Sequence, residues 1–289
     1  MNLFRSAEII YVSALAFLIG NLAFLRTYRI ALHLYPLHSN FFQGISLTRS
    51  YLSTKYGLKI RLWSKSLIDH KVLFTGVYEA SSNKILEKYI KPGSIVIEAG
   101  ANIGTETLLL SRLAGNQGSI FAFEPVSALK DRLEENCRLN SLDNVIIEQL
   151  ALGESNGSIS FYIADEAFTN QGMGSKRLVN QHLKNEIIVS QVTLDTYCEQ
   201  KGITTLHFIK MDIQGAELDL LKGGEKIITQ SRPFIFLEAG DGWSSLADLY
   251  EWLSSSGFEV YLIREDATLD LIARENILPG NWLAKSNRF

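Results

Sequence analysis

This sequence has few cysteines and no excess of positive charge. Cys137 and Cys198 are the only cysteines among 289 residues, and they form no C-x-x-C pair. A structural zinc site and a disulfide framework are therefore not indicated, and a reducing, cytoplasmic setting is the simplest expectation. Lysine and arginine number 28 against 31 acidic residues, a formal net charge of -3. This balance gives no general attraction for a polyanion, so we do not expect nucleic acid as a partner.

Repeats, low-complexity tracts and the phosphate-binding G-x-x-x-x-G-K-[ST] sequence are also missing. The hydrophobic fraction of 46% and the charged fraction of 20% are ordinary for globular proteins, so wholesale disorder is not expected. A chain of 289 residues suits one catalytic domain with an N-terminal extension.

One long apolar run is present, at residues 9–25, and Arg26 and Arg29 follow it. A helix of this length spans roughly 25 Å, slightly less than the ~30 Å hydrocarbon core of a membrane. Two interpretations stay open. Residues 7–29 anchor the protein to a membrane, with the arginines keeping the downstream domain cytoplasmic, or they form a helix buried on the domain or lying at an interface. A cleaved signal peptide fits less well, because the run is longer than a usual h-region.

The rest of the chain alternates between short apolar runs and helical stretches, which is typical of a parallel sheet covered on both faces. A β-rich insertion with a mobile loop at 169–175 is expected between residues 153 and 193, either as a specificity element or as a solvated hairpin. Residues 41–73 indicate an N-terminal strand or hairpin subregion. We predict seven core strands at 94–98, 119–123, 145–149, 207–211, 234–237, 258–263 and 281–284. Helices are predicted at 81–90, 105–114, 127–140, 216–221 and 245–255.

The predicted fold is therefore α/β: a Rossmann-like, seven-stranded, mostly parallel sheet with a β-rich insertion and an N-terminal hydrophobic helix. We divide the chain into the hydrophobic helix (1–30), an N-terminal subregion (31–90) and a catalytic domain (91–289).

The most informative segment is Val96-Ile97-Glu98-Ala99-Gly100-Ala101-Asn102-Ile103-Gly104, a strand end, a glycine-rich turn and a helix start. Open α/β sheets bind ligands at this position. Gly100 and Gly104 let the backbone turn sharply and approach a ligand closely, although glycines at such a turn can equally serve packing alone. Asn102 stands where a dinucleotide G-x-G-x-x-G sequence needs its middle glycine, so a cofactor without a bridging pyrophosphate is favoured.

Acidic residues follow three of the predicted strands. Glu124, before Pro125, is placed to accept hydrogen bonds from the ribose hydroxyls of an adenosine group, while a surface glutamate is the alternative. Asp212 ends another strand at the same edge, where it meets the amino-acid part of a cofactor or a substrate hydroxyl. Glu238 ends the next strand. Lys210 is either functional or part of a salt bridge.

Two further residues near these strands receive structural interpretations. Glu217, in the helix after Asp212, either caps a backbone N–H group or forms an ion pair with a basic side chain. His207 begins a buried strand and is interpreted as structural.

Together these motifs resemble the FkbM family of S-adenosylmethionine-dependent methyltransferases. The resemblance implies the class I methyltransferase sheet, S-adenosylmethionine as cofactor and, usually, O-methylation of a hydroxyl on a sugar or secondary metabolite. It runs from about Gly76-Val77-Tyr78-Glu79 to the C-terminus and also includes Asn136 to Val145, Ala151-Leu152-Gly153, Thr193-Leu194-Asp195 and Arg232-Pro233. We place the cofactor at Glu98, Gly100, Ala101, Asn102, Gly104, Glu124, Pro125, Ala151 and Asp212.

Two positions depart from the family pattern, which more often has Asp where this chain has Glu98 and Glu where it has Gln214. The first change keeps the charge on a longer arm, whereas the second removes a carboxylate from the turn that would supply a catalytic base.

Methyl transfer to an alcohol requires in-line alignment and removal of the hydroxyl proton. The candidate catalytic residues are Asp212, Glu238 and Lys210, with Asp212 as the base or acceptor-positioning group and Glu238 as its rival. The sequence gives metal assistance no support.

The expected partner is a small-molecule or glycan acceptor, and a glycolipid or lipid-linked sugar if residues 7–29 anchor the protein. Two rival functions stay open. The first is a nicotinamide-dependent oxidoreductase, which would need a glycine at the position of Asn102. The second is a non-catalytic, membrane-tethered interaction module, which would retain the fold without turnover. The oligomeric state is not predicted.

Overall fold

The computed structural model describes residues 47–51, 56–62, 68–69, 71–72, 76–164, 174–175, 183–240 and 245–286. These residues divide into two compact units, one before Glu79 and one beginning at Glu79. The apolar run at 9–25 and most of the loop expected at 169–175 lie outside the described residues. Within the described residues, no helix has the length and apolar character needed to cross a membrane.

The first unit contains an antiparallel pair of strands, β1 (Leu47–Tyr51) and β2 (Leu58–Leu62). Side chains alternate along β2, so that Leu58, Ile60 and Leu62 are buried while Lys59 is exposed. The pair agrees with the strand or hairpin expected between residues 41 and 73.

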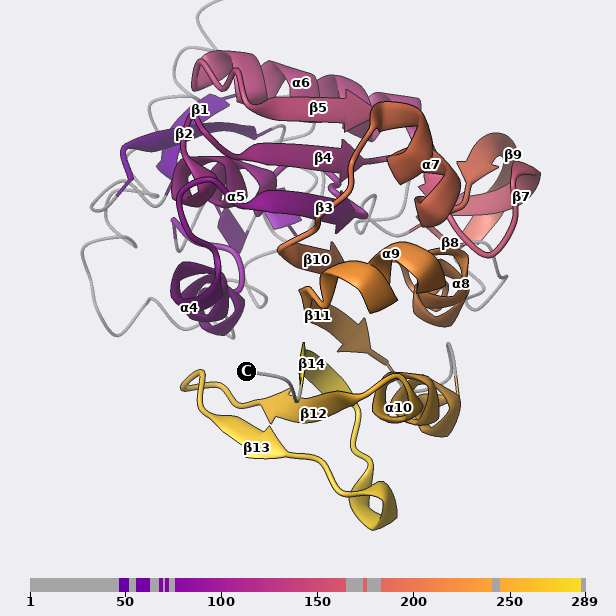
Figure 1. The fold of residues 1–289 in the computed structure, drawn as a ribbon. Helices are drawn as coiled ribbons and strands as arrows, with labels where there is room; N and C mark the ends of the chain where they lie inside the picture. Colours follow the sequence, from indigo (N-terminus) through magenta and orange to yellow (C-terminus); the bar gives the residue numbers. More distant parts are fainter. Residues whose placement is uncertain are drawn as a thin grey trace, which may run out of the picture. The chain divides into compact units, whose positions relative to one another are not determined.

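The second unit is built on an eight-stranded sheet with the order β13-β12-β14-β11-β10-β3-β4-β5 (Figure 1). All seven predicted strands are present, each within about two residues of its expected ends. Numbered along the chain, they lie in the order 3-2-1-4-5-7-6, and the seventh, β14, is antiparallel to both neighbours. The strands are β3 (Ile95–Ala99), β4 (Ser119–Phe123), β5 (Val145–Glu148), β10 (Phe208–Met211), β11 (Phe234–Ala239), β12 (Phe258–Ile263), β13 (Leu269–Leu271) and β14 (Gly280–Ser286).

The eighth strand, β13, was not predicted from the sequence. It spans three residues at the sheet edge and pairs with β12, and Asp270 and Leu271 are exposed, so it carries no apolar pattern. The Rossmann-like α/β sheet is otherwise confirmed.

Seven α-helices accompany the sheets in the part of the chain that the structure describes. The helices α7 and α9 were not predicted, because α7 is largely polar and α9 follows α8 after Gly223 and Gly224. The helices are α4 (Ala80–Tyr89), α5 (Thr107–Ala114), α6 (Ser127–Leu139), α7 (Leu194–Lys201), α8 (Glu217–Gly223), α9 (Glu225–Ser231) and α10 (Leu246–Ser255).

The main hydrophobic core lies on one face of the central strands. Ile97, Ile209 and Ile235 pack there with apolar side chains from α7, α8, α9 and α10. Since side chains alternate along a strand, the residues between them, including Glu98 and Lys210, point to the opposite face. Glu98 and Lys210 lie opposite each other on β3 and β10. The fold thus places charged side chains inside the sheet on the face away from the main core.

The β-rich insertion forms a separate four-stranded sheet of order β6-β9-β7-β8. Its main pair is antiparallel, β7 with β9, while β6 runs parallel to β9. The strands are β6 (Ala151–Leu152), β7 (Gly157–Ala164), β8 (Gly174–Ser175) and β9 (Leu183–Val192).

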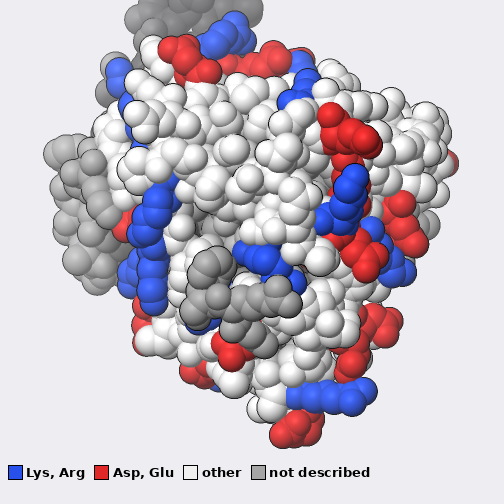
Figure 2. All heavy atoms as spheres, viewed as in Figure 1, with Lys and Arg blue, Asp and Glu red and all other residues white. Residues whose placement is uncertain are grey.

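Charged side chains of both signs occur on the face of the molecule drawn in Figure 2. Among the described residues on that face, lysine and arginine are mixed with aspartate and glutamate, as the small net charge of the sequence leads one to expect.

Candidate active site

The glycine-rich loop between β3 and α5 is folded tightly against the rest of the chain. Gly100 has a φ of +80° and Gly104 a φ of +90°. A Cβ atom at Gly100 would lie 2.0 Å from the carbonyl oxygen of Asp212, and one at Gly104 would lie 2.6 Å from Cδ1 of Leu133. Both glycines are therefore required by packing within the protein, which was the alternative that the sequence left open.

Glu124 holds this loop from the end of β4. Its Oε2 accepts a hydrogen bond from the backbone N–H of Asn102 and its Oε1 accepts one from Val126, both at 2.9 Å. Glu124 is 4% exposed, so the surface-glutamate alternative is wrong. Burial raises its pKa to about 7. Each carboxylate oxygen retains capacity for a further hydrogen bond, which a ribose hydroxyl could donate.

Asn136 also fixes the glycine-rich loop, and sequence reasoning assigned it no such role. Its Nδ2 donates to the backbone oxygen of Ile103 at 2.8 Å, and the residue is fully buried. The signal was available, because Asn136 lies on the apolar face of α6 with Leu129 and Leu133. An amide on such a face indicates a buried polar contact.

A buried ionic layer lies beside this loop, between β3, β10 and the start of α5. The Lys210 ammonium forms an ion pair with Oε2 of Glu106 at 2.5 Å. Oε2 of Glu98 accepts a hydrogen bond from the Thr107 hydroxyl at 2.6 Å. Burial alone would lower the pKa of Lys210, but Glu106, Asp212 and Glu98 raise it. Lys210 is therefore a permanent cation in a salt bridge.

Carboxylates outnumber this cation in the buried layer. Glu98 is 0% exposed and Glu106 is 4% exposed, and in each the Oε1 atom has no hydrogen-bond partner among the described residues. Burial raises the pKa of Glu98 to about 8 and that of Glu106 to about 7. Buried carboxylate oxygens without a partner are costly, so this layer is suited to a cationic ligand.

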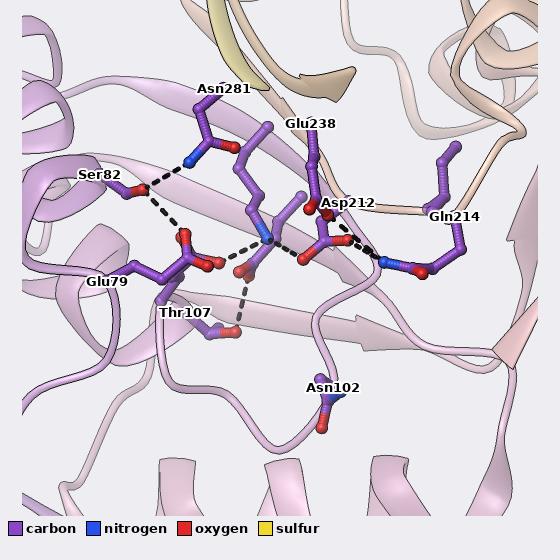
Figure 3. A network of polar contacts seen from close by, with 12 residues as sticks. Glu79, Ser82, Asn102, Thr107, Asp212, Gln214, Glu238 and Asn281 are labelled. Atoms are coloured by element: carbon purple, nitrogen blue, oxygen red, sulfur yellow. Dashed lines mark hydrogen bonds and ion pairs between the residues drawn. The ribbon is translucent and has the colours of Figure 1, made fainter. Parts of the chain in front are cut away.

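A half-buried group of polar residues follows at the carboxyl ends of β10 and β11 (Figure 3). The Gln214 amide bridges two acids: Nε2 donates to Oδ1 of Asp212 at 3.0 Å and to Oε2 of Glu238 at 3.4 Å. Burial, the Asp212 charge and a hydrogen bond between the two carboxyl groups raise the pKa of Glu238 to about 9. Glu238 is therefore protonated at neutral pH, and its carboxyl group can donate a hydrogen bond to Asp212.

Three residues from α4 and β14 complete this group, and sequence reasoning gave none of them a role. The Ser82 hydroxyl donates to Oε2 of Glu79 at 2.8 Å, and Nδ2 of Asn281 reaches the Ser82 hydroxyl at 3.5 Å. Asn281 lies opposite Glu238 in the pairing of β14 with β11. Glu79 acts electrostatically on both Glu106 and Glu238. Figure 3 shows these side chains converging with Asp212 and Gln214.

The remaining predicted residues have mainly structural positions. Oε1 of Glu217 accepts hydrogen bonds from the backbone N–H groups of Ile213 and Gly215, both at 3.2 Å, which is the capping role. Nδ1 of His207 accepts the Ile95 N–H, as a structural histidine would. Ala151 lies in β6 of the insertion sheet, apart from the polar group, and Pro125 follows Glu124.

In the described part of the chain, no cluster of three or more His, Cys, Asp or Glu residues is arranged to hold a metal ion.

Comparisons with known proteins identify the family to which the chain belongs. The methyltransferase FkbM domain matches residues 98–260, more than half of the chain. The 2-O-methyltransferase NoeI of Sinorhizobium fredii is 30% identical over 172 residues, covering 56% of this chain and 67% of that protein. Methyltransferase 1 of Beauveria bassiana is 27% identical over 188 residues, covering 60% and 75%. The hexuronic acid methyltransferase AglP of Haloferax volcanii is 27% identical over 159 residues, covering 55% and 61%.

Proposed function

Because the chain belongs to the FkbM methyltransferase family, we propose that it transfers a methyl group to a hydroxyl oxygen of a sugar or a sugar-containing metabolite. The protein is an S-adenosylmethionine-dependent methyltransferase. Two relatives support the finer proposal through their names, one a 2-O-methyltransferase and the other a hexuronic acid methyltransferase. A secondary metabolite with a hydroxyl group belongs to the same acceptor class.

The residues present fit this cofactor. S-adenosylmethionine supplies an electrophilic methyl group on a positively charged sulfur, and its amino-acid part carries an ammonium group. The buried layer contains two carboxylate oxygens without partners, on Glu98 and Glu106. Glu98 is fully buried, so we assign it an electrostatic role beneath the loop.

Direct cofactor contacts are assigned along the sheet edge. We assign the ribose hydroxyls to Glu124 and the amino-acid part of the cofactor to the end of β10, at Asp212. The other proposed contacts are Gly100, Ala101, Asn102, Gly104, Pro125 and Ala151.

Asp212 is the proposed general base. A sugar hydroxyl is poorly acidic, so its proton must be accepted while its oxygen attacks the methyl group. The Asp212 side chain is 30% exposed, which leaves it accessible to an acceptor. Glu238 is a weaker candidate, because its raised pKa keeps it protonated at neutral pH. Lys210 stays protonated and cannot accept a proton, so its proposed role is to hold Glu106 and, at 3.9 Å, the Asp212 carboxylate.

Gln214 and Glu217 keep the proposed base in position. Gln214 bridges Asp212 and Glu238 with one amide nitrogen. Glu217 fixes the backbone of the same turn through two N–H groups. The departure from the family pattern at Gln214 therefore leaves the turn with a hydrogen-bond donor between two acids, while Asp212 remains available as the base.

The single observation that carries this proposal is the pair Asp212 and Glu238, bridged by the Gln214 amide at 3.0 and 3.4 Å at the edge of the sheet where the glycine-rich loop lies. We expect Asp212→Asn to lower kcat by about 10²- to 10⁴-fold and, because the same carboxylate is assigned to the amino-acid part of the cofactor, to weaken S-adenosylmethionine binding by a much smaller factor, about tenfold. Glu238→Gln preserves a neutral side chain that donates a hydrogen bond, so kcat should fall by less than about tenfold. Formation of S-adenosylhomocysteine with glycoside acceptors and calorimetric cofactor titration measure the two quantities.

Asp270→Asn is the matched control, since Asp270 is an exposed acid paired with Arg264 near the sheet edge. Near-normal turnover of Asp212→Asn would contradict the assignment of the base. Cofactor binding without turnover on any hydroxylated acceptor would favour the rival function, a non-catalytic interaction module.

The division at residues 30 and 90 and the membrane anchor at residues 7–29 stay predictions. If residues 7–29 hold the enzyme at the cytoplasmic surface of a membrane, the acceptor is a glycolipid or a lipid-linked sugar.

A further inference from the structure

Glu79, Ser82 and Asn281 form a polar wall outside residues 98–260, the segment that the FkbM domain matches, although the wider resemblance of the sequence to that family begins near Glu79. We call these three residues the α4–β14 wall. Ser82 is buried, whereas Glu79 and Asn281 are half-buried like Asp212 and Glu238. The wall faces the proposed base in Figure 3. It is therefore placed where a specificity element of the acceptor site would be needed.

The conformation of Glu79 indicates a role other than capping its helix. It occupies the N-cap position of α4 with φ of 47° and ψ of 71°, yet its side chain makes no capping hydrogen bond. A left-handed conformation costs a residue with a Cβ roughly 1–2 kcal/mol. The carboxylate accepts instead from the Ser82 hydroxyl, which orients it toward the polar group. Backbone strain at a residue whose side chain is directed into a polar group is typical of functional sites.

The described titratable side chains around this wall are acids apart from Lys210, although Glu238 is protonated and therefore uncharged at neutral pH. Glu79, Asp212 and Glu238 surround the proposed acceptor position, and Glu106 lies beneath them with an unpartnered buried oxygen. In the described part of the chain, Lys210 is the only lysine or arginine in an ion pair with these acids. Lys210 is 2% exposed and is engaged by Glu106, so it is not available to an anionic group of an acceptor.

We propose that the α4–β14 wall binds the acceptor and selects a sugar that is neutral or carries an amine, against a sugar that carries a carboxylate or phosphate. This inference rests on the proposed function. Carboxylates accept hydrogen bonds from sugar hydroxyls and pair with ammonium groups, and the Asn281 amide can both donate and accept. An anionic sugar would place a second negative charge beside Glu79, and the described residues offer no free cation to balance it, a juxtaposition that is costly where water is excluded.

Three glycosides that differ only at carbon 6 test the proposal: methyl glucoside, its 6-amino-6-deoxy analogue and methyl glucuronide. We measure kcat/KM from S-adenosylhomocysteine formation, and in parallel the Kd of each glycoside for the protein loaded with S-adenosylhomocysteine. The glucoside and the amino analogue should exceed the glucuronide by about tenfold or more in both quantities. The full chain is used throughout.

Variants of the wall identify its contribution. Glu79→Gln retains an acceptor for the Ser82 hydroxyl but removes the negative charge. The ratio of kcat/KM for the glucoside to kcat/KM for the glucuronide should therefore fall at least about threefold, with a larger change in KM than in kcat. Ser82→Ala removes the hydroxyl that orients the Glu79 carboxylate. It should therefore also narrow the preference for glucoside over glucuronide, mainly through KM. Glu259→Gln, an exposed acid on β12, is the control and should leave the preference unchanged.

The outcomes separate this inference from the proposed function. A wild-type preference for glucuronide, or an unchanged preference in Glu79→Gln, overturns the inference even if methylation occurs. Binding in the expected order without methylation supports the inference and contradicts the proposed function. Failure of all three glycosides to bind the loaded protein overturns the inference.

Discussion

The two proposed sides of the candidate active site, the cofactor side and the acceptor side, are held together by different kinds of contact. On the cofactor side, the glycine-rich loop is fixed by backbone groups, with two N–H groups bound to the Phe123 oxygen and one to Glu124. On the acceptor side, side chains from α4, β10, β11 and β14 contact one another. The loop tolerates few substitutions at its glycines, because a Cβ atom at Gly100 or Gly104 would clash, whereas the side chains of the second group can be replaced without moving the backbone. The acceptor specificity that we propose therefore rests on these side-chain contacts.

The largest effect is expected where the two sides touch, at Gly100. Gly100→Ala should lower the free energy of unfolding by about 3 kcal/mol or more, because the new Cβ would lie 2.0 Å from the Asp212 oxygen at a φ of +80°. Gly202→Ala is the control, since Gly202 is in the left-handed region with a φ of +68° and a ψ of 25°, and nothing lies within 4 Å of its Cβ position. It should cost only about 1–2 kcal/mol of backbone strain.

Urea unfolding measures both changes. Equal destabilisation by the two substitutions would contradict the claim that the loop and the Asp212 turn are in tight contact. It would also weaken the contrast between the backbone-fixed side and the side-chain-fixed side.

A smaller effect concerns the carboxyl groups with raised pKa values, about 8 for Glu98, about 7 for Glu106 and Glu124, and about 9 for Glu238. A cationic ligand favours their ionised forms, so binding of S-adenosylmethionine lowers these pKa values and releases protons. Affinity should therefore rise by about tenfold between pH 6 and pH 9. S-adenosylhomocysteine lacks the sulfonium charge and should show a weaker rise.

Calorimetric titrations in two buffers of different ionisation enthalpy count the protons released. Glu98→Gln should reduce that number, because it removes the most deeply buried of these acids. Proton uptake on binding, or an affinity that falls as the pH rises, would contradict the claim that these carboxyl groups ionise when the cationic ligand binds.

The sequence was sufficient to predict the sheet and the acids at its edge. Apolar runs located all seven core strands, and acidic residues at strand ends located Glu124, Asp212 and Glu238. The short edge strand β13 and the helices α7 and α9 lack a clear apolar period, since tertiary contacts outweigh local pattern there. The glycine pattern was found, but its cause, contact with Asp212 and Leu133, was visible only in three dimensions.

The residues that complete the acceptor side could not be found from spacing. Glu79 and Asn281 are about 200 positions apart, and only the docking of α4 beside β14 brings them together through Ser82. Glu106 begins α5 and gave no pattern of its own, because its role depends on Lys210 in another strand. Asn136 was the exception, since a polar residue on the apolar face of α6 could have been noticed.

Titration of the purified full chain with S-adenosylmethionine, beside Glu124→Ala and Glu124→Gln, tests the central claim most directly. Calorimetry gives the affinities, NAD serves as a control ligand, and thermal melting shows that each variant is folded. We predict micromolar binding to the wild type, loss of at least about 30-fold in Glu124→Ala, an intermediate loss in Glu124→Gln, and no binding of NAD. A folded wild type that binds no S-adenosylmethionine, or a folded Glu124→Ala variant that binds it with unchanged affinity, would contradict the account.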